Sequence, residues 1–336
     1  MIRLISALFI CLLAEACSSP SNTLETSEKD ISDSANEVSS PESAEPVRVP
    51  KLAVEVRVLG VAQDAGYPQI NCKKACCAAY WTGKRVKESP TCLGIIDRVN
   101  KKMWMMEATP DIVAQWQLLQ ENCPTCEMAG ILITHAHMGH YTGLMQLGRE
   151  AMGAQGVPVY VMPKMMEYLR NNGPWSQLVN LGNIELRPLQ NDSSLQLSSM
   201  VSVRPFLVPH RDEYSETVGF SIKGLGNGAL FIPDIDKWSK WDQSIAGLVK
   251  EHELAFLDGT FYDGTELPGR DMSEIPHPFI KESMSTFQDL SMRERGRIHF
   301  IHFNHTNPLL DTESSQAAEL QKAGFSIASL NDFYDL

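Results

Sequence analysis

Three histidines, His135, His137 and His140, lie within six residues of one another. They follow a short β-branched run at residues 131–134, and a helix-like segment at 141–150 comes after them. This order predicts a buried strand, a loop that carries the histidines, and then a helix. Neutral imidazole is the commonest nitrogen ligand of zinc, and a catalytic zinc takes about three protein ligands with one position open. The spacing therefore predicts a metal centre rather than three unrelated loop histidines.

The segment T-H-A-H-M-G-H at residues 134–140 resembles the T-H-x-H-x-D-H signature of the metallo-β-lactamase superfamily, with Gly139 in place of the aspartate. Three later segments follow in the order of that superfamily, each with a polar residue that ends an apolar run: Val208-Pro209-His210, Ile232-Pro233-Asp234 and Phe300-Ile301-His302. The resemblance implies an α+β fold, the αββα sandwich of the metallo-β-lactamase type, in which helices cover two facing sheets.

Within this superfamily, three stretches are similar to the pyrroloquinoline quinone biosynthesis protein B branch: G-Y-P-Q-I-N-C at residues 66–72, D-G-T at 258–260 and H-F-N-H-T-N-P at 302–308. This resemblance runs from about Val54 to Leu336. A more distant resemblance, to the cyclic phosphodiesterase of bacterial phosphonate breakdown, includes a cysteine-rich insertion after the first strand.

The resemblance implies a metal-ligand role for six residues, and it makes His135, His137, His140 and Asp234 the catalytic candidates. His135, His137 and His210 would hold the first metal. Asp234 would lie between two metals as a bridging carboxylate, and His140 and His302 would complete the second site. Three ligands thus remain for the second ion, the minimum for a catalytic zinc, so the glycine weakens that site without forbidding it.

The departure at Gly139 also concerns the reaction. The aspartate of the superfamily orients the attacking water, so its loss puts the standard two-metal hydrolysis in doubt. An aspartate introduced at position 139 would be expected to restore a ligand and a negative charge, and with them the second ion.

Other polar residues near these motifs have two interpretations each. Asp258 ends an apolar run and is either a residue that orients a ligand histidine through a hydrogen bond or a plain turn aspartate. Arg211 follows a predicted ligand and is a candidate substrate-binding residue, although a solvated loop residue is the ordinary alternative. His277, in a proline-rich loop, is a second candidate for the pocket lining.

Six cysteines follow the N-terminal pair: Cys72, Cys76, Cys77, Cys92, Cys123 and Cys126. Their spacing is compatible with a structural zinc site, two disulfides or a mixture. The resemblance to the phosphodiesterase implies that Cys72, Cys76, Cys77 and His305 hold a structural zinc, whereas export of the chain would favour disulfides.

The N-terminus reads as an export signal. Arg3 precedes an apolar run at residues 4–13, about half of the ~20 residues that span a bilayer. Cys17 resembles the cysteine of a bacterial lipoprotein box, which predicts lipidation of Cys17 and a membrane contact through a lipid anchor only, with simple secretion to the periplasm as the alternative. Residues 18–48 have the composition of a disordered tether, and residues 49–336 form the predicted metallo-β-lactamase-like domain.

Composition and pattern agree with this division. The 336 residues are 43% hydrophobic, and a net charge of −12 leaves no basic face for nucleic acid.

A hairpin is expected around Asn100, and a helix with Thr109 as its N-cap is expected to follow. Mixed strand and strand–helix patterns favour helices outside two sheets. The expected strands are 52–60, 93–96, 103–106, 157–162, 184–189, 201–208, 217–222 and 229–232, and the expected helices 112–120 and 164–171.

These observations predict an exported, metal-dependent hydrolase, with zinc as the expected metal. The predicted substrate is a small molecule with an ester-like bond, either a phosphodiester or a carboxylic ester or lactone, attacked by activated water. One or two zinc ions are expected in the active site. A one-metal oxygenase or redox enzyme is an alternative, because histidines with one carboxylate also suit iron. A non-catalytic periplasmic accessory or binding protein that keeps the metal site is another.

Overall fold

The computed structural model describes residues 52–336, and all of these belong to one compact unit. The predicted export signal, Cys17 and the tether lie outside the described residues. None of the described helices is both long and apolar enough to cross a membrane.

Two seven-stranded sheets form the centre of the unit, with the orders β14-β1-β2-β3-β4-β5-β6 and β13-β12-β11-β10-β9-β8-β7. The strands of the first sheet are β1 (Val54–Gly60), β2 (Cys92–Asp97), β3 (Lys102–Met106), β4 (Glu127–Leu132), β5 (Val157–Val161), β6 (Ile184–Pro188) and β14 (Phe333–Asp335). Those of the second are β7 (Leu195–Gln196), β8 (Ser202–Leu207), β9 (Val218–Lys223), β10 (Gly228–Ile232), β11 (Leu254–Asp258), β12 (Ile298–Ile301) and β13 (Ser326–Ile327).

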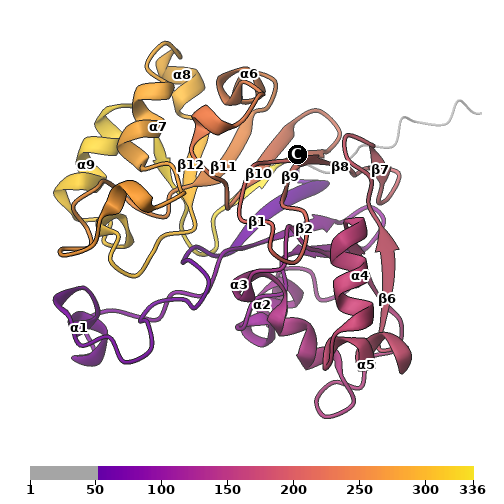
Figure 1. Cartoon of the computed structure of the whole chain (residues 1–336). Helices are drawn as coiled ribbons and strands as arrows, with labels where there is room; N and C mark the ends of the chain where they lie inside the picture. The colour runs from indigo at the N-terminus through magenta and orange to yellow at the C-terminus, as the bar shows by residue number, and fades with distance from the viewer. Residues whose placement is uncertain (1–51) are drawn as a thin grey trace, which may run out of the picture. The chain divides into compact units, whose positions relative to one another are not determined.

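Helices lie outside the sheets, with α2 to α5 beside the first sheet and α6 to α9 beside the second (Figure 1). The α-helices are α1 (Ala75–Trp81), α2 (Ile112–Asn122), α3 (Met138–Tyr141), α4 (Pro163–Asn171), α5 (Trp175–Asn180), α6 (Ile245–Lys250), α7 (Ile280–Thr286), α8 (Met292–Arg295) and α9 (Ser315–Lys322). Four 3₁₀ turns complete the described helices: η1 (Thr142–Leu147), η2 (Trp238–Lys240), η3 (Met272–Glu274) and η4 (Pro308–Leu310).

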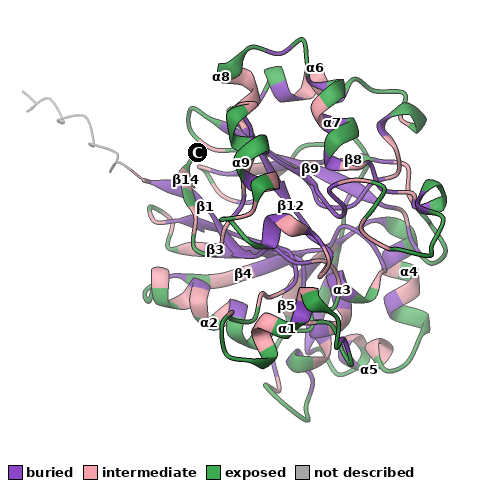
Figure 2. Cartoon of the chain, turned by 90° about the vertical axis from the view of Figure 1, so that its left-hand side faces the viewer, coloured by how far each residue is buried: buried purple, intermediate pink, exposed green. Residues whose placement is uncertain are grey.

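The alternation of side chains along a strand divides the core into layers. On β3, Trp104 and Met106 belong to the apolar cluster shared with the second sheet, whereas Met103 and Met105 belong to the cluster shared with α2, α4 and α5. Figure 2 shows the consequence, with buried strands in the middle and helices that are exposed on their outer faces. The predicted αββα sandwich is confirmed.

Most predicted elements are present, but the start of one helix and the extent of another were predicted wrongly. The hairpin around Asn100 is formed by β2 and β3, which pair antiparallel. The α2 helix begins after Asp111 rather than at Thr109, whose hydroxyl accepts the amide of Asp111 (3.1 Å) and donates to Gln115 (2.6 Å). The helix expected at 141–150 is the short α3 followed by the 3₁₀ turn η1. There the amide of Gly143 donates to the carbonyl of Ala108 rather than continuing an α-helix.

Candidate metal centre

The predicted ligands meet where strands of both sheets end. Residues 135–140 form the loop and the helix start after β4 of the first sheet. In the second sheet, β10, β11 and β12 run parallel, so their carboxyl ends lie at one edge. Asp234, Asp258 and His302 occupy those ends, and His210 follows β8. The two sheets therefore supply side chains to a common centre.

The first cluster comprises His135, His137, His210 and Asp234, whose ligand atoms all lie within 4.8 Å of one another. Nε2 of His135 lies 2.8 Å from Nδ1 of His137, which lies 3.3 Å from Nε2 of His210. Asp234 places Oδ2 3.3 Å from His135 and Oδ1 3.2 Å from His210. Two ligands of one tetrahedral zinc, each about 2.0–2.1 Å from it, lie roughly 3.3 Å apart, so the spacing fits one ion.

The outer nitrogens of these three histidines contact oxygen atoms. His135 contacts the Thr134 hydroxyl (2.8 Å), His137 the Glu213 carboxylate (3.1 Å) and His210 the Asp236 carboxylate (3.3 Å). Each outer nitrogen thus has an acceptor for a proton. A proton held there leaves the lone pair of the inner nitrogen free for a metal.

The second cluster contains His140 and His302 and one residue that the sequence did not indicate, Asp64. Nε2 of His140 lies 3.5 Å from Oδ1 of Asp64 and 3.8 Å from Oδ2 of Asp234. Asp234 is thus close to both clusters, as expected for a bridging carboxylate.

The space beside Gly139 is already filled. A Cβ atom added at Gly139 would lie 2.3 Å from Cα and 2.6 Å from Oδ1 of Asp64, far inside van der Waals contact. The expectation that an aspartate at position 139 would simply restore a ligand is therefore wrong. The backbone at Asp64 would have to move to admit any side chain there.

Two more residues that the sequence did not indicate, Glu107 and Thr260, support the second cluster. The fully buried Glu107 places Oε1 3.3 Å from Nδ1 of His140. The Thr260 hydroxyl lies 2.7 Å from Oδ1 of Asp258 and 3.0 Å from Nδ1 of His302. If it donates to Asp258 and accepts from His302, Nε2 of His302 keeps a free lone pair.

Electrostatics at the centre favour cations. Burial disfavours a charged imidazole at His140, but the carboxylates of Glu107 and Asp64 outweigh it and raise the pKa of His140 to about 10. Burial also favours a neutral Asp234, yet the imidazoles, His210 foremost, hold the pKa of Asp234 well below its usual range. Ionised carboxylates that stabilise protons here would stabilise a metal dication in the same place.

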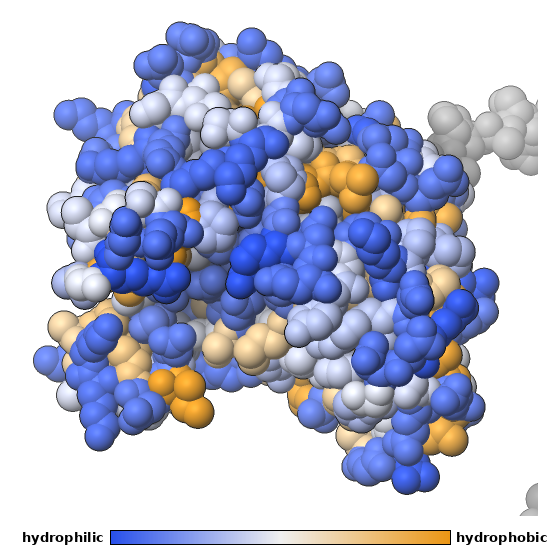
Figure 3. Space-filling model, viewed as in Figure 1, coloured by the Kyte–Doolittle hydropathy of each residue, from blue (hydrophilic) through white to orange (hydrophobic). Residues whose placement is uncertain are grey.

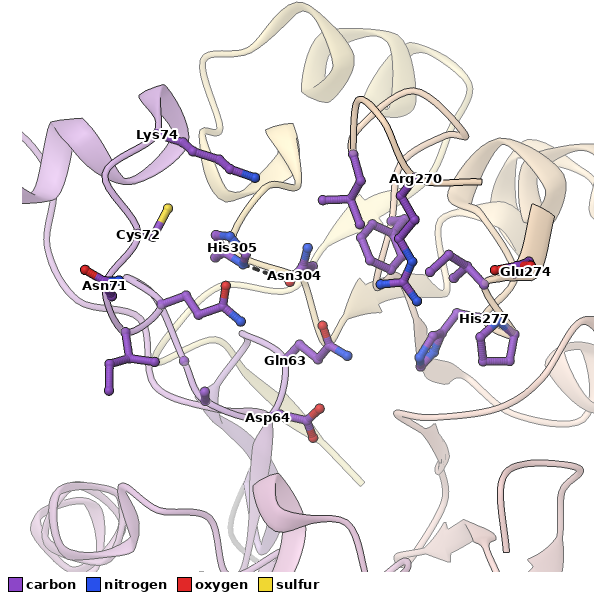
Figure 4. A pocket seen from close by; sticks show the side chains of 18 of the residues that line it. Gln63, Asp64, Asn71, Cys72, Lys74, Arg270, Glu274, His277, Asn304 and His305 are labelled. Carbon is purple, nitrogen blue, oxygen red and sulfur yellow. Dashed lines mark hydrogen bonds between the residues drawn. The ribbon is translucent and has the colours of Figure 1, made fainter. Parts of the chain in front are cut away.

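A cavity of about 960 Å³ opens beside the second cluster. Figure 4 shows Cys72 and Lys74 at one side of it, His277 at the opposite side, and Asp64 at the bottom between them. His277 lies 2.8 Å from Oδ2 of Asp258 and 3.2 Å from Oδ1 of Asp234, so it belongs to the buried centre as well as to the cavity wall. The exposed Arg211 also lines the cavity. The face of the molecule that Figure 1 presents is mostly hydrophilic (Figure 3).

The cysteines at the far side of the cavity form a separate cluster. Ligand atoms of Cys72, Cys76, Cys77 and His305 lie within 4.8 Å of one another. The Sγ atoms of Cys72 and Cys76 are 3.7 Å apart, close to the roughly 3.8 Å expected for two thiolates on one tetrahedral zinc. A disulfide joins Cys123 to Cys126, whereas Cys72, Cys76, Cys77 and Cys92 are free thiols. Two disulfides are therefore not formed within residues 52–336, and a structural zinc at the cysteine cluster stays a prediction.

Comparison with known proteins agrees with this geometry. The family described as the β-lactamase superfamily domain matches residues 105–303, more than half of the chain, and the chain belongs to that superfamily. It is similar to the coenzyme PQQ synthesis protein B of Pseudomonas fluorescens, with 25% identity over 300 residues that cover 81% of this chain and 97% of the relative. The predicted resemblance to that branch is confirmed.

Two solved structures share the fold. The Zn(2+)-bound PqqB of Methylobacterium extorquens has a TM-score of 0.70 and 20% identity, and the match covers 84% of this chain and all of that one. A diphosphatase from the PhnP family has a TM-score of 0.56 and 19% identity, with 84% of this chain and 96% of that one covered. These two likenesses show the fold alone, and the candidate metal centre rests on the His/Asp clusters of this chain.

Proposed function

We propose that the protein is a zinc-dependent hydrolase of an ester-like bond in a small molecule, and that the bond is a phosphodiester in preference to a carboxylic ester or lactone. One observation carries the proposal: Asp234 belongs to the first cluster of imidazole and carboxylate groups and lies 3.8 Å from His140 of the second, and beside them lies a cavity lined by basic side chains. When bound at these clusters, zinc supplies a Lewis acid and activates water for attack.

The charges of the cavity favour the phosphodiester. Although the whole chain carries a net charge of −12, the cavity wall includes four basic side chains: Lys73, Lys74, Arg211 and Arg270. Among them, Arg270 reaches into the cavity (Figure 4). A guanidinium binds phosphate oxygens through charge-assisted hydrogen bonds, whereas an uncharged ester offers it no negative partner. The diphosphatase of similar fold is in keeping with a phosphorus-containing substrate.

His277 is the candidate for holding a proton beside the leaving group. Burial opposes its charge, but the carboxylates of Asp258 and Asp234 prevail and raise the pKa of His277 to about 9. The raised pKa favours the protonated imidazole, with Nδ1 facing Asp258. Because His277 also lines the cavity, it can donate a proton to a departing alkoxide.

The test is a substrate panel on the purified full chain with added zinc. We expect hydrolysis of bis(p-nitrophenyl) phosphate to exceed that of p-nitrophenyl acetate and of a simple lactone. Asp234→Asn should lower the phosphodiesterase rate by at least about 100-fold, because both clusters lose a shared charge. Asp242→Asn, a change of the same kind at an exposed position, should leave it unchanged.

Three results would contradict the proposal. A preference for the uncharged esters would overturn the phosphodiester assignment. Iron as the purified metal, without hydrolysis, would favour the oxygenase alternative. Bound zinc with no turnover of any of these substrates would favour a binding protein.

A further inference from the structure

Asp64, in the turn after β1, lies where the superfamily motif would have placed a different carboxylate. We propose that Asp64 is a direct ligand of the second metal ion and replaces the aspartate that the motif lacks at Gly139. The proposal rests on the metal-binding part of the proposed function, and it does not depend on whether the protein hydrolyses esters.

Steric contact shows that positions 64 and 139 share one space. The Cβ built at Gly139 meets Cα, Oδ1 and the carbonyl oxygen of Asp64 at 2.3, 2.6 and 3.0 Å. The Cβ atom of an aspartate at position 139 would therefore occupy the volume in which Asp64 now lies. The turn after β1 has brought a carboxylate to that place from the other side.

The distances from Asp64 suit a shared ion. Its Oδ1 atom is 3.5 Å from Nε2 of His140, and ligand atoms of Asp64, His140 and His302 all lie within 4.8 Å. Two imidazole nitrogens and one carboxylate oxygen thus converge, and Oδ2 of Asp234 borders them at 3.8 Å from Nε2 of His140. This donor set suits zinc and other borderline cations.

Among the described residues, the polar atoms that face this point have no hydrogen-bond partner. These atoms are Nε2 of His140, Nε2 of His302 and Oδ1 of Asp64, and all three are shielded from solvent. His140 is 1% exposed and His302 is fully buried. Buried polar atoms without partners are costly, and a cation among them would satisfy all three at once.

An ion pair between His140 and Asp64 without a metal would leave one of these three buried atoms without a partner. It would leave Nε2 of His302 without a partner within residues 52–336, and the contact between Asp64 and His140 lacks hydrogen-bond geometry. The backbone also points to a site that is held in place. Asp64, Glu107 and His302 are non-glycine residues with positive φ values of 28°, 86° and 69°, a conformation that tertiary structure must enforce.

The first experiment counts ions. Full-length wild type, Asp64→Asn and Glu274→Gln are dialysed against a series of buffered zinc concentrations, and bound metal is measured by mass spectrometry. Asn keeps the shape of Asp64 and removes its charge. We expect Asp64→Asn to bind its weakest ion in the His/Asp centre at least about tenfold less tightly than wild type. Glu274→Gln removes one negative charge from the same cavity wall and should bind like wild type.

The second experiment detects ligation directly, so it remains informative if Asp64→Asn folds poorly. In Asp64→Cys loaded with Co²⁺, a thiolate at position 64 should add a sulfur-to-cobalt charge-transfer band to the wild-type spectrum. In Glu274→Cys no such band should be added. A residue with a merely structural role would not produce this band.

The outcomes separate this proposal from the hydrolase proposal, because neither experiment measures activity. A tenfold or larger loss of affinity in Asp64→Asn, or a new band in Asp64→Cys, supports ligation by Asp64. Binding curves of Asp64→Asn that coincide with those of Glu274→Gln would overturn it. So would a wild-type His/Asp centre that accepts only one ion at saturating zinc, or a cobalt spectrum of Asp64→Cys identical to that of wild type.

Discussion

Glu107 is a buried carboxylate whose only ion-pair partner among residues 52–336 is His140. A buried charge of this kind is costly unless a cation lies near it, and here the cation is either a protonated imidazole or a metal beyond it. The carboxylate raises the basicity of the imidazole and fixes its ring, which makes it part of the metal centre without contact to the ion.

Replacing this carboxylate should weaken the second metal site. In Glu107→Gln we expect the affinity of the ion beside His140 to fall about 10- to 100-fold, since groups that hold a ligand histidine in place have effects of this size. Competition for zinc with a chromophoric chelator measures this affinity. Glu55→Gln is the matched control, because Glu55 is also buried but pairs with Arg57 and Arg98. Equal zinc affinities in the two variants would contradict a role for Glu107.

A second buried residue should make stability depend on pH. Burial lowers the pKa of His299 to about 4, below its unfolded value near 6.5. Between these values the unfolded chain binds a proton that the folded chain does not, so stability is complete above about pH 6.5 and falls as the pH decreases towards 4.

The corresponding measurement is urea unfolding at pH 6.5 and 5.5. Wild type should lose about 1 kcal/mol more unfolding free energy over this interval than His299→Gln, which does not titrate but can still contact the Tyr334 hydroxyl. Parallel pH profiles for the two proteins would show that His299 is not responsible.

At the residue scale, sequence reasoning found the side chains that repeat a motif and missed those that do not. His135 and His137 were recognisable from spacing alone. Glu107 had a usable signal, since it ends the apolar run of β3 as Asp258 ends that of β11. Asp64 had none, because only the folded turn after β1 brings it to Gly139, 75 positions away in the chain.

Among the elements, α1 and the segment before it depend most on the cysteine cluster. This helix has seven residues, and only Cys77 of them is buried. An isolated helix of this length is unstable in water. A zinc held by Cys72, Cys76, Cys77 and His305 would fasten it to the loop after β12.

Cysteine substitution should separate this cluster from the histidine centre. We expect Cys72→Ser to lose one zinc and to lower the unfolding temperature, because structural zinc binding is coupled to folding. A variant with His135→Ala and His137→Ala should keep that ion. Cys92→Ala, which removes a buried thiol distant from these ligands in the chain, should keep the full metal content. Disulfides at Cys72 and Cys77, found by non-reducing mass spectrometry, would disprove the zinc assignment.

Elements with strong local patterns were predictable, whereas those formed by tertiary contacts were not. The β2–β3 hairpin follows from its apolar runs. By contrast, α3 and η1 replaced one expected helix because Gly143 packs against the backbone of the loop before α2. No local propensity indicates such a contact.

For the folded unit as a whole, the metal centre joins the two sheets. The first sheet supplies the loop with His135 and His140, and the second supplies Asp234 and His302 at the ends of parallel strands. An ion bound by both groups would oppose their separation, so metal binding should contribute to global stability.

Removal of the metal should therefore lower the unfolding temperature. At zinc concentrations about 100 times the dissociation constant, binding adds about 2.7 kcal/mol, which corresponds to roughly 5 °C or more for a domain of this size. Calorimetry with and without a chelator measures the change. In Asp234→Asn the zinc-dependent shift should be smaller, and a shift of equal size would place the stabilising ion outside the His/Asp centre.

The location of the chain is a prediction from the sequence alone. If Cys17 carries a lipid, the protein should be found in the membrane fraction and Cys17→Ala in the soluble fraction.

The close approach of Gly139 to Asp64 also restricts how this sequence can change. Because a Cβ at position 139 would lie 2.3 Å from the main chain at Asp64, no single substitution at 139 can return the motif to its usual aspartate while the turn after β1 keeps its path. An insertion, a deletion or a rearrangement in that turn would have to come first. A single substitution at position 139 is therefore not enough to exchange the carboxylate of Asp64 for one at position 139.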